Sequence, residues 1–278
     1  MIIKSDWHIH SEHSYDATTP LEVIGSEATA QGLVRFGITD HLNLNDESFK
    51  GDLSASAAGV AEAKKKYPVM TLGVELTPIA KPEFDYIAKF GTREGYIAPV
   101  QPEPYGIELA MTREELMARG VRYAIGASHW RVDEAGVTKD DVQLDKCIRE
   151  WYRQQMMMAE DDRVTVLGHP WYHGKGAWYE DFTLIPRSMN MDIAEALKRN
   201  KKYVECNAHF FTNRMVTEKF RRQYADFLRE LFEMGIPITY GSDSHCGYGD
   251  HRAAVEKYLA AAGFGEGDFS EIAEADLW

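Results

Sequence analysis

The stretch "DWHIH" at residues 6–10 sets two histidines one residue apart, close to the start of the chain. In a β-strand, alternate side chains project from the same face, so His8 and His10 would lie side by side. Two neutral imidazoles on one face can chelate a divalent cation. The alternative for an isolated pair of this kind is two histidines that face solvent, so the remaining sequence has to decide between them.

Six further stretches have strand-like composition, and segments with helical patterns separate them. The seven strand-like stretches are residues 5–11, 34–41, 68–77, 121–130, 164–171, 202–208 and 237–245. Strands that alternate with helices predict an α/β fold with a parallel sheet and right-handed crossovers. We therefore expect a closed or nearly closed barrel of the TIM type, in which active-site groups lie at the carboxyl ends of the strands.

Helix signals occupy the intervals between these stretches. Thr19 is expected to be an N-cap with Pro20 at the first helical position, and "TREE" at 112–115 has the pattern of a capping box. The clearest helix is 215–234, where apolar residues recur at the spacing of one buried stripe. The expected helices are residues 20–32, 54–66, 112–119, 139–160, 190–201, 215–234 and 250–262.

Residues 79–111 are rich in proline and glycine and interrupt this alternation. We interpret them as an insertion after the third strand that forms a flap over the site. A chain of 278 residues suits one large α/β barrel, so residues 1–278 are predicted to form a single domain.

Composition argues against several classes of partner. The net charge of −13 disfavours nucleic acid, because phosphate backbones bind basic surfaces. No apolar run approaches the roughly 18 residues of a membrane span, and the first residues contain no secretory signal. The three cysteines are scattered, which argues against a disulfide framework and fits a reducing cytoplasm. The sequence gives no indication of the oligomeric state.

Residue types that commonly bind metals lie in the predicted strands, mostly near their carboxyl ends. Each of them alone has an ordinary structural interpretation, such as a turn or a hydrogen-bonded core histidine. An acid such as Glu75 on an apolar strand is costly, however, without a cation or partner. A shared cluster of divalent cations explains the whole set, which is His8, His10, Asp16, His41, Glu75, His129, His169, Asp243 and His245.

The ordered motifs resemble the PHP (polymerase and histidinol phosphatase) family. They are "HIH" with "SYDA" at 8–17, "GITDH" at 37–41, "GVE" at 73–75, "SHW" at 128–130, "GHP" at 168–170 and "GSDSH" at 241–245. They occur in the order of the family and span nearly the whole chain. The resemblance implies a distorted seven-stranded β/α barrel, (β/α)7, that holds up to three divalent metals.

The resemblance also implies how the ligands are shared among the metals. His8, His10, Glu75 and Asp243 would hold the first metal, and Glu75 would bridge to a second metal completed by His129 and His169. The third metal would take Asp16, His41 and His245. In the loop that contains Asp16, His13 is an alternative ligand, and Ala17 stands where the family often has glycine.

Open coordination positions in such a cluster indicate catalysis. A metal lowers the pKa of bound water to about 7, and paired metals hold the oxygens of a phosphate. We therefore predict a metal-dependent phosphoesterase, in which a metal-bridging hydroxide attacks a small phosphate monoester in line, either histidinol phosphate or another phosphorylated metabolite. Asp243, His245 or a metal-bound water would protonate the leaving alkoxide. The metals would be two or three ions of Zn, Mn or Fe, without an organic cofactor.

A phosphate dianion also favours an arginine fork. Arg131 directly follows "SHW" and is the first candidate, both as a catalytic and as a substrate-binding residue. Arg214, Arg252 and His209 lie in segments that follow the last two strands and are further substrate-binding candidates. The alternative for each is a surface or packing role.

Two other functions remain open. An amidohydrolase also combines a His-x-His pair with later histidines and an aspartate on a barrel. Its bridging group is often a carbamylated lysine, whereas this chain offers Glu75, and a two-metal site has no use for Asp16, His41 and His245. The other possibility is a non-catalytic PHP domain that only binds metal, although such domains usually lack several of the ligands.

Overall fold

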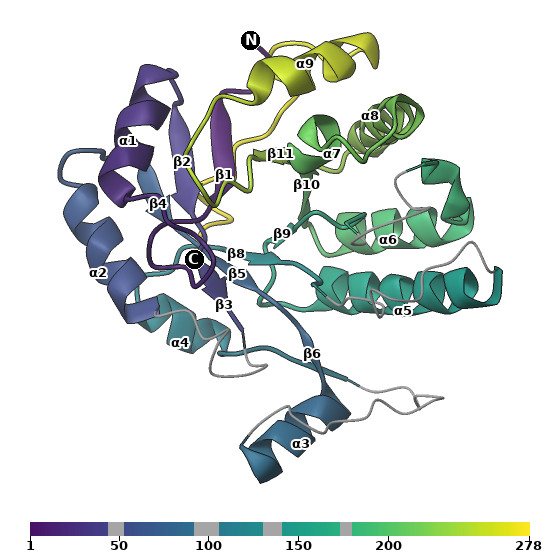
Figure 1. Ribbon diagram of the computed structural model, residues 1–278, viewed down its shortest axis with the longest axis horizontal. Helices are drawn as coiled ribbons and strands as arrows, with labels where there is room; N and C mark the ends of the chain where they lie inside the picture. The colour runs from purple at the N-terminus through teal and green to yellow at the C-terminus, as the bar shows by residue number, and fades with distance from the viewer. Residues whose placement is uncertain (44–52, 92–105, 130–140, 173–179) are drawn as a thin grey trace.

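Parallel strands form the centre of the molecule, and helices surround them (Figure 1). The computed structural model describes residues 1–43, 53–91, 106–129, 141–172 and 180–278. The central strands are β1 (Ser5–Ile9), β2 (Arg35–Ile38), β3 (His41–Leu42), β4 (Met70–Leu72), β5 (Val74–Leu76), β8 (Ala124–Gly126), β9 (Val166–Leu167), β10 (Tyr203–Asn207) and β11 (Ile238–Gly241). They form a sheet of order β1-β2-β4 and a sheet of order β11-β10-β9-β8-β5-β3.

Two of the expected strands are each divided in two. The stretch 34–41 gives β2 and β3, and the stretch 68–77 gives β4 and β5. The first halves pair in the sheet of β1, whereas the second halves pair in the sheet of β8. The chain therefore crosses from one sheet to the other twice. This division was not predicted, because the apolar pattern runs through both halves of each stretch.

The two sheets also meet on their other side, next to β1. A single parallel bridge joins Ile9 to Ser244, and the amide of Asp243 donates a 2.8 Å hydrogen bond to the carbonyl of His8. These contacts bring the end of β1 next to the segment that follows β11. The architecture is an α/β fold of the TIM type, as the sequence predicted.

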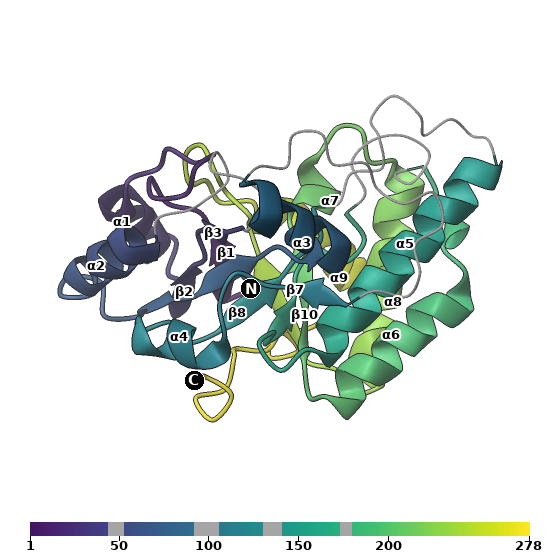
Figure 2. The ribbon, with the colours of Figure 1, turned by 90° about the horizontal axis from the view of Figure 1, so that it is seen from below.

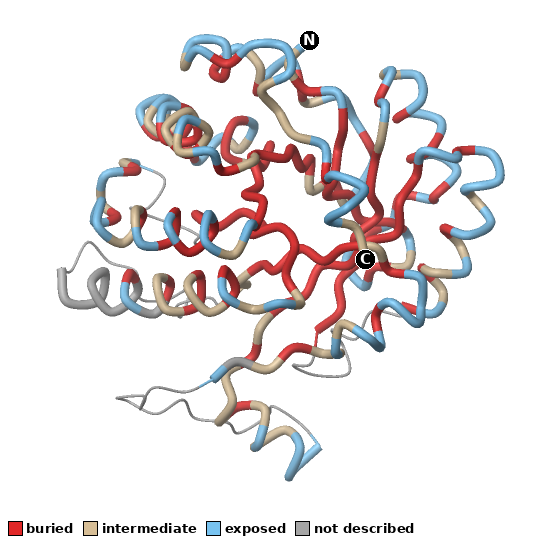
Figure 3. The backbone as a smooth tube through the Cα atoms, turned by 180° about the vertical axis from the view of Figure 1, so that it is seen from behind, coloured by how far each residue is buried: buried red, intermediate tan, exposed pale blue. Residues whose placement is uncertain are grey.

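Helices cover the outer faces of the strands (Figures 1 and 2). Their buried residues face inward and their exposed residues face outward (Figure 3). All seven expected helices form, with ends shifted by a few residues. The helices are α1 (Leu21–Ala30), α2 (Leu53–Ala63), α3 (Lys81–Phe90), α4 (Arg113–Ala118), α5 (Asp141–Glu160), α6 (Arg187–Arg199), α7 (His209–Thr212), α8 (Glu218–Glu233) and α9 (Arg252–Ala261). In the described part of the chain, no helix has the length and apolar character that crossing a membrane requires.

The helix caps confirm one expectation and correct another. Thr112 and Glu115 form the predicted capping box at α4. At α1, however, the N-cap is Pro20, and the side chain of Thr19 does not cap the helix. Thr19 instead accepts a hydrogen bond from the amide of Gly247 at 2.7 Å. Its hydroxyl thus ties the loop after β1 to the loop after β11, where several of the predicted ligands lie.

The insertion at 79–111 begins and ends with two short strands. β6 (Ile79–Ala80) and β7 (Ile107–Glu108) pair antiparallel, and α3 follows β6 directly. The helix α3 was not predicted. Pro82 lies in the first turn of this helix, where the backbone N–H that proline lacks would have no partner within the helix. Gly91 ends the helix in the left-handed conformation. Residues 92–105 lie outside the described residues, so the predicted flap stays a prediction.

A separate group of buried side chains fills the interior between the strands. It contains Trp7, Tyr123, Ile125, Ala127, Val166, Tyr203 and, from the C-terminal segment, Ile272. The Tyr123 hydroxyl donates a 2.7 Å hydrogen bond to the carbonyl of Trp7. Its ring lies against the backbone at Gly37 and Gly73, where an added Cβ would approach the Tyr123 side chain to 1.7 Å and 2.5 Å, respectively. These two positions therefore require glycine for steric reasons.

We predict that Gly37→Ala destabilises the protein by about 1–3 kcal/mol through overpacking against Tyr123. Tyr123→Phe removes the hydroxyl that the new methyl would meet first, at a cost of about 1 kcal/mol for the lost hydrogen bond. The double variant should therefore be more stable than the sum of the single changes by at least roughly 0.5 kcal/mol, as measured by urea unfolding. Strict additivity would contradict this account of the contact.

Candidate metal centre

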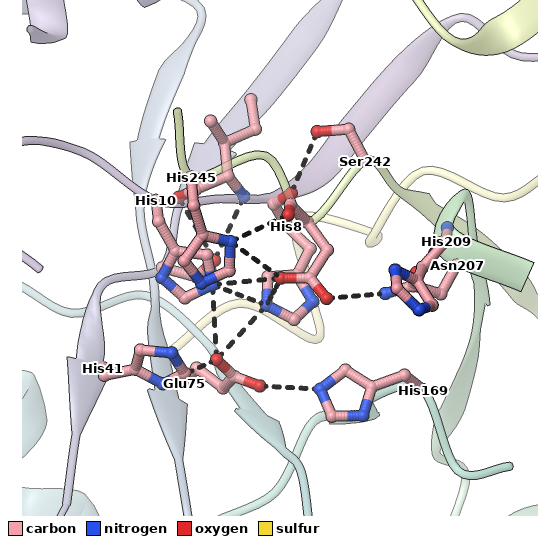
Figure 4. A network of polar contacts seen from close by, with 12 residues as sticks. His8, His10, His41, Glu75, His169, Asn207, His209, Ser242 and His245 are labelled. Carbon is pink, nitrogen blue, oxygen red and sulfur yellow. Dashed lines mark hydrogen bonds and ion pairs between the residues drawn. The ribbon is translucent and has the colours of Figure 1, made fainter. Parts of the chain in front are cut away.

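The carboxylate of Glu75, on β5, lies at the centre of the candidate site and is fully buried. Five imidazoles surround it, as Figure 4 shows in part. From its two oxygens, the nearest ring nitrogens lie at 2.8 Å (His41), 3.0 Å (His169), 3.3 Å (His10), 3.4 Å (His8) and 3.5 Å (His129). One carboxylate therefore connects five histidines from four separate segments of the sequence, since His8 and His10 both belong to the first.

His8 and His10 project from the same face at the end of β1, as the spacing predicted. Their Nε2 atoms are 3.1 Å apart. The Oδ1 atom of Asp243 lies 3.5 Å from Nε2 of His8 and 3.3 Å from Nε2 of His10. These three residues offer ligand atoms close enough together to hold one metal ion.

A further group lies around Asp16, in the loop after β1. Its Oδ2 atom is 3.3 Å from Nε2 of His41 and 3.3 Å from Nε2 of His245. The alternative ligand, His13, lies elsewhere, because its ring packs close to Gly59 in α2. The geometry therefore favours Asp16 over His13.

All the residues of the predicted ligand set come together, but the groups overlap more than the predicted scheme. His10 lies near Asp16, His41 and His245 as well as near His8 and Asp243. His41 also shares a group with Glu75 and His129. His169 joins the cluster through its contact with Glu75. The assignment of individual ligands to individual ions thus stays a proposal.

The backbone at two of these residues has an uncommon conformation. His169 has a φ of 24° and Asp243 a φ of 54°. Residues other than glycine rarely adopt positive φ, and such strain gathers at functional sites, where the surrounding contacts hold it. Both residues lie just after a strand. The turn of the backbone directs the side chain of His169 toward Glu75 (Figure 4) and that of Asp243 toward His8.

Opposite charges dominate the electrostatics of the cluster. Burial acts to raise the pKa of Glu75, but His41 and His8 outweigh burial and hold that pKa well below its usual range. In the same way, His8 and His10 overcome the effect of burial and keep the pKa of Asp243 low. Burial acts to lower the pKa of His41, yet Glu75 and Asp16 raise it to about 10. The acids therefore need positive charge beside them.

Two buried atoms in the cluster lack a hydrogen-bond partner among the described residues and are placed to bind a cation instead. Nδ1 of His41 and Oε2 of Glu75 are 2.8 Å apart and buried, yet neither forms a hydrogen bond within the described part of the chain. Mixed imidazole and carboxylate ligands suit Zn, Mn and Fe, and cations displace protons from such ligands on binding. The residues present therefore fit a divalent metal centre.

Sequence analysis missed the residues that orient these ligands. Glu205 and Asn207 on β10 contact three of them, and the Thr77 hydroxyl lies 2.9 Å from Nδ1 of His129. Partners of this type fix the orientation of metal-binding histidines. The available signal was Glu205 itself, a charged residue inside the otherwise apolar stretch "YVEC".

The predicted substrate-binding residues have different surroundings. His209 lies near Asn207, beside the cluster (Figure 4), and burial lowers its pKa. Arg214 is exposed. The guanidinium of Arg252 is buried and donates hydrogen bonds to Asp250 and to the carbonyl of Gln31. These contacts give Arg252 a structural role in place of the predicted contact with substrate. Arg131 lies outside the described residues.

Comparison with known families identifies the class of this protein. The PHP domain matches residues 6–209, and the chain belongs to this family. A comparison with curated proteins gave no match.

The solved structures that match the chain include two enzymes. One is histidinol phosphate phosphatase from Lactococcus lactis subsp. lactis Il1403, complexed with zinc, L-histidinol and phosphate. It has a TM-score of 0.71 and 19% identity, covering 100% of this chain and 99% of that one. The other is a Xaa-Pro dipeptidase with bound methionine, with a TM-score of 0.43 and 14% identity, covering 94% and 70%. The likeness to the phosphatase supports the TIM-like fold.

The two alternative ligands in the loop after β1 can be separated by mutation. We predict that Asp16→Ala weakens metal binding by at least roughly tenfold, because even the loss of an outer partner costs about that much. His13→Ala is the matched control and should retain the metal content of the unmodified protein. Elemental analysis measures the metal content of each variant, and competition with a chromophoric chelator measures its metal affinity. The reverse result would identify His13 as the ligand.

Proposed function

We propose that the protein is a metal-dependent phosphatase that hydrolyses a small phosphate monoester. The observation that carries this proposal is the cluster around Glu75, extended by Asp16, His41 and His245 beyond what a two-metal site needs. Membership of the PHP family supports it. When bound, the metals would activate water and neutralise the charge of the phosphoryl group.

The residues of the cluster divide by their access to solvent. His8, His10 and Glu75 are completely buried, so their role is to hold metal. The side chains of Asp243 and His245 are partly accessible, at 19% and 28%. Together with Asp16 and His129, whose side chains are 33% and 32% accessible, they form the edge that a substrate would meet. We propose that the proton for the leaving alkoxide comes from Asp243, His245 or a metal-bound water.

The phosphate would also meet groups from neighbouring loops. His209 is half-buried beside the cluster, and its Nε2 atom lies 2.6 Å from Nδ2 of Asn213. This contact holds the ring in place and supports a role in contacting substrate. Arg131 and Arg214 remain the proposed arginines for the phosphate, and the insertion at 79–111 the proposed flap.

For the substrate, we propose histidinol phosphate or a phosphorylated metabolite of similar size. The support is the similar fold of the enzyme crystallised with zinc, L-histidinol and phosphate. For the metals, the same complex and the nitrogen and oxygen ligands favour zinc, with Mn and Fe as alternatives. The amidohydrolase alternative is disfavoured by Glu75, which would bridge two metals where an amidohydrolase often has a carbamylated lysine.

A screen of phosphorylated metabolites, histidinol phosphate among them, tests the proposed activity. The released phosphate and the metal content are measured on the same sample. We expect turnover of at least one monoester, which chelation abolishes and added Zn or Mn restores. A fully metallated protein that releases no phosphate, but hydrolyses amides or lactones, would favour an amidohydrolase. A protein inactive in both assays would favour a non-catalytic metal-binding domain.

We further predict that His8→Ala abolishes turnover, by at least about 10³-fold, because it removes a ligand that positions the reacting groups. The fold should remain, since a smaller side chain at the end of β1 leaves the ladder between β1 and β2 intact. Circular dichroism checks the fold, and phosphate release checks the activity. His251→Ala, in the loop before α9, is the control and should be as active as the unmodified protein. An unchanged rate in His8→Ala would remove this residue from the cluster.

A further inference from the structure

Strand β10 supplies none of the proposed metal ligands, yet two of its polar side chains are buried beside them. Glu205 and Asn207 are 1% and 0% exposed and alternate along the strand, so they project from the same face. An acid and an amide inside a barrel are costly unless their polar atoms are used. Their contacts therefore indicate why the chain keeps them there.

Both oxygens of Glu205 hold a proposed ligand in place. Oε1 lies 2.6 Å from Nδ1 of His8, and Oε2 accepts a 2.6 Å hydrogen bond from the backbone amide of His169. Nδ2 of Asn207 lies 3.2 Å from this Oε2 atom and 3.2 Å from Oδ2 of Asp243. The pair thus reaches ligands from β1, from the end of β9 and from the end of β11.

We propose that Glu205 is the positioning residue of the metal centre. Its carboxylate holds His8 in the form that carries hydrogen on Nδ1 and fixes the strained backbone of His169. The inference rests on the proposed metal role of the cluster, but it does not depend on the identity of the substrate.

The chemistry of the contact with His8 determines which ring nitrogen is available. A carboxylate only accepts hydrogen bonds, so Nδ1 of His8 is the donor. In the neutral ring, Nε2 then presents its lone pair, and this atom lies 3.1 Å from Nε2 of His10 and 3.4 Å from Oε2 of Glu75. A lone pair directed at another ring nitrogen and a carboxylate oxygen is the arrangement that a cation between them would stabilise.

The neighbouring strand leaves room for this contact. Gly241 on β11 is paired with Asn207. An added Cβ at Gly241 would lie 1.9 Å from Oε1 of Glu205 and 2.7 Å from Cβ of His8. Only glycine at this position allows the carboxylate and the imidazole to meet. Gly241 therefore provides a second, independent way to disturb the contact.

The same geometry makes Glu205→Gln a sharp test. Glutamine has the shape of glutamate but only one oxygen, whereas His8 and the amide of His169 each require an acceptor. The amide group of glutamine would either oppose the amide of His169 or force His8 to place its hydrogen on Nε2, where it blocks the metal. Glu256→Gln is the matched control, because Glu256 accepts backbone hydrogen bonds from Ile2 and Ile3, away from the cluster.

We expect Glu205→Gln to weaken zinc binding by about 10–100-fold in chelator competition, as is typical for partners of metal-binding histidines. Gly241→Ala should act in the same direction, and Glu256→Gln should bind zinc like the unmodified protein. Circular dichroism establishes that each variant is folded. Unchanged zinc affinity in folded Glu205→Gln would overturn the proposal, even if its thermal stability falls, because the residue would then be only structural.

A measurement on the unmodified, zinc-loaded protein tests the inference without any reliance on a Glu205 variant. Nitrogen NMR of labelled histidine, with His8 assigned by comparison with His8→Ala, should show hydrogen on Nδ1 and metal on Nε2. Hydrogen on Nε2 would overturn the inference. If the protein binds no divalent cation at all, the metal centre and this inference both fail. If zinc is bound and Glu205→Gln weakens it, the inference holds, even where no phosphate monoester is hydrolysed.

Discussion

The rest of the structure depends on the burial of one carboxylate, Glu75, in the centre of a barrel. A charged group without solvent requires compensating charge and hydrogen bonds. Here the compensation comes from five imidazoles within 3.5 Å, and divalent cations are the charges that such a set of ligands is suited to hold. The strand ends, the strained turns and the loop contacts are therefore best understood as the means by which the chain brings these rings to one carboxylate.

The fold meets this demand with two layers of support. In the interior between the strands, Trp7 and Tyr123 pack together, and Gly37 and Gly73 leave space for the tyrosine ring. Beside the cluster, Glu205 contacts His8 directly. A site of this kind works only when its ligands are held within a fraction of an ångström, so the supporting groups matter as much as the ligands.

Much of this arrangement was predictable. The spacing of His8 and His10 indicated that they share a face, and the ends of the strand-like stretches marked the remaining ligands, because the carboxyl ends of parallel strands meet at one end of a barrel. The capping box at Thr112 also formed as predicted. The helix α3 was missed, since proline and glycine were interpreted as signs of a loop although they lie at its two ends.

The sequence alone determined the order of the elements, the set of candidate ligands and the resemblance to the PHP family, because these depend on local periodicity and on the types of residue at strand ends. Only the tertiary structure placed Asp16 rather than His13 beside His41 and His245, divided two strands between two sheets, assigned Arg252 to Asp250 and Gln31, and placed Glu205 against His8. The physical reason is that each of these outcomes depends on contacts between residues far apart in the chain, and local patterns carry no information on which distant atoms will meet.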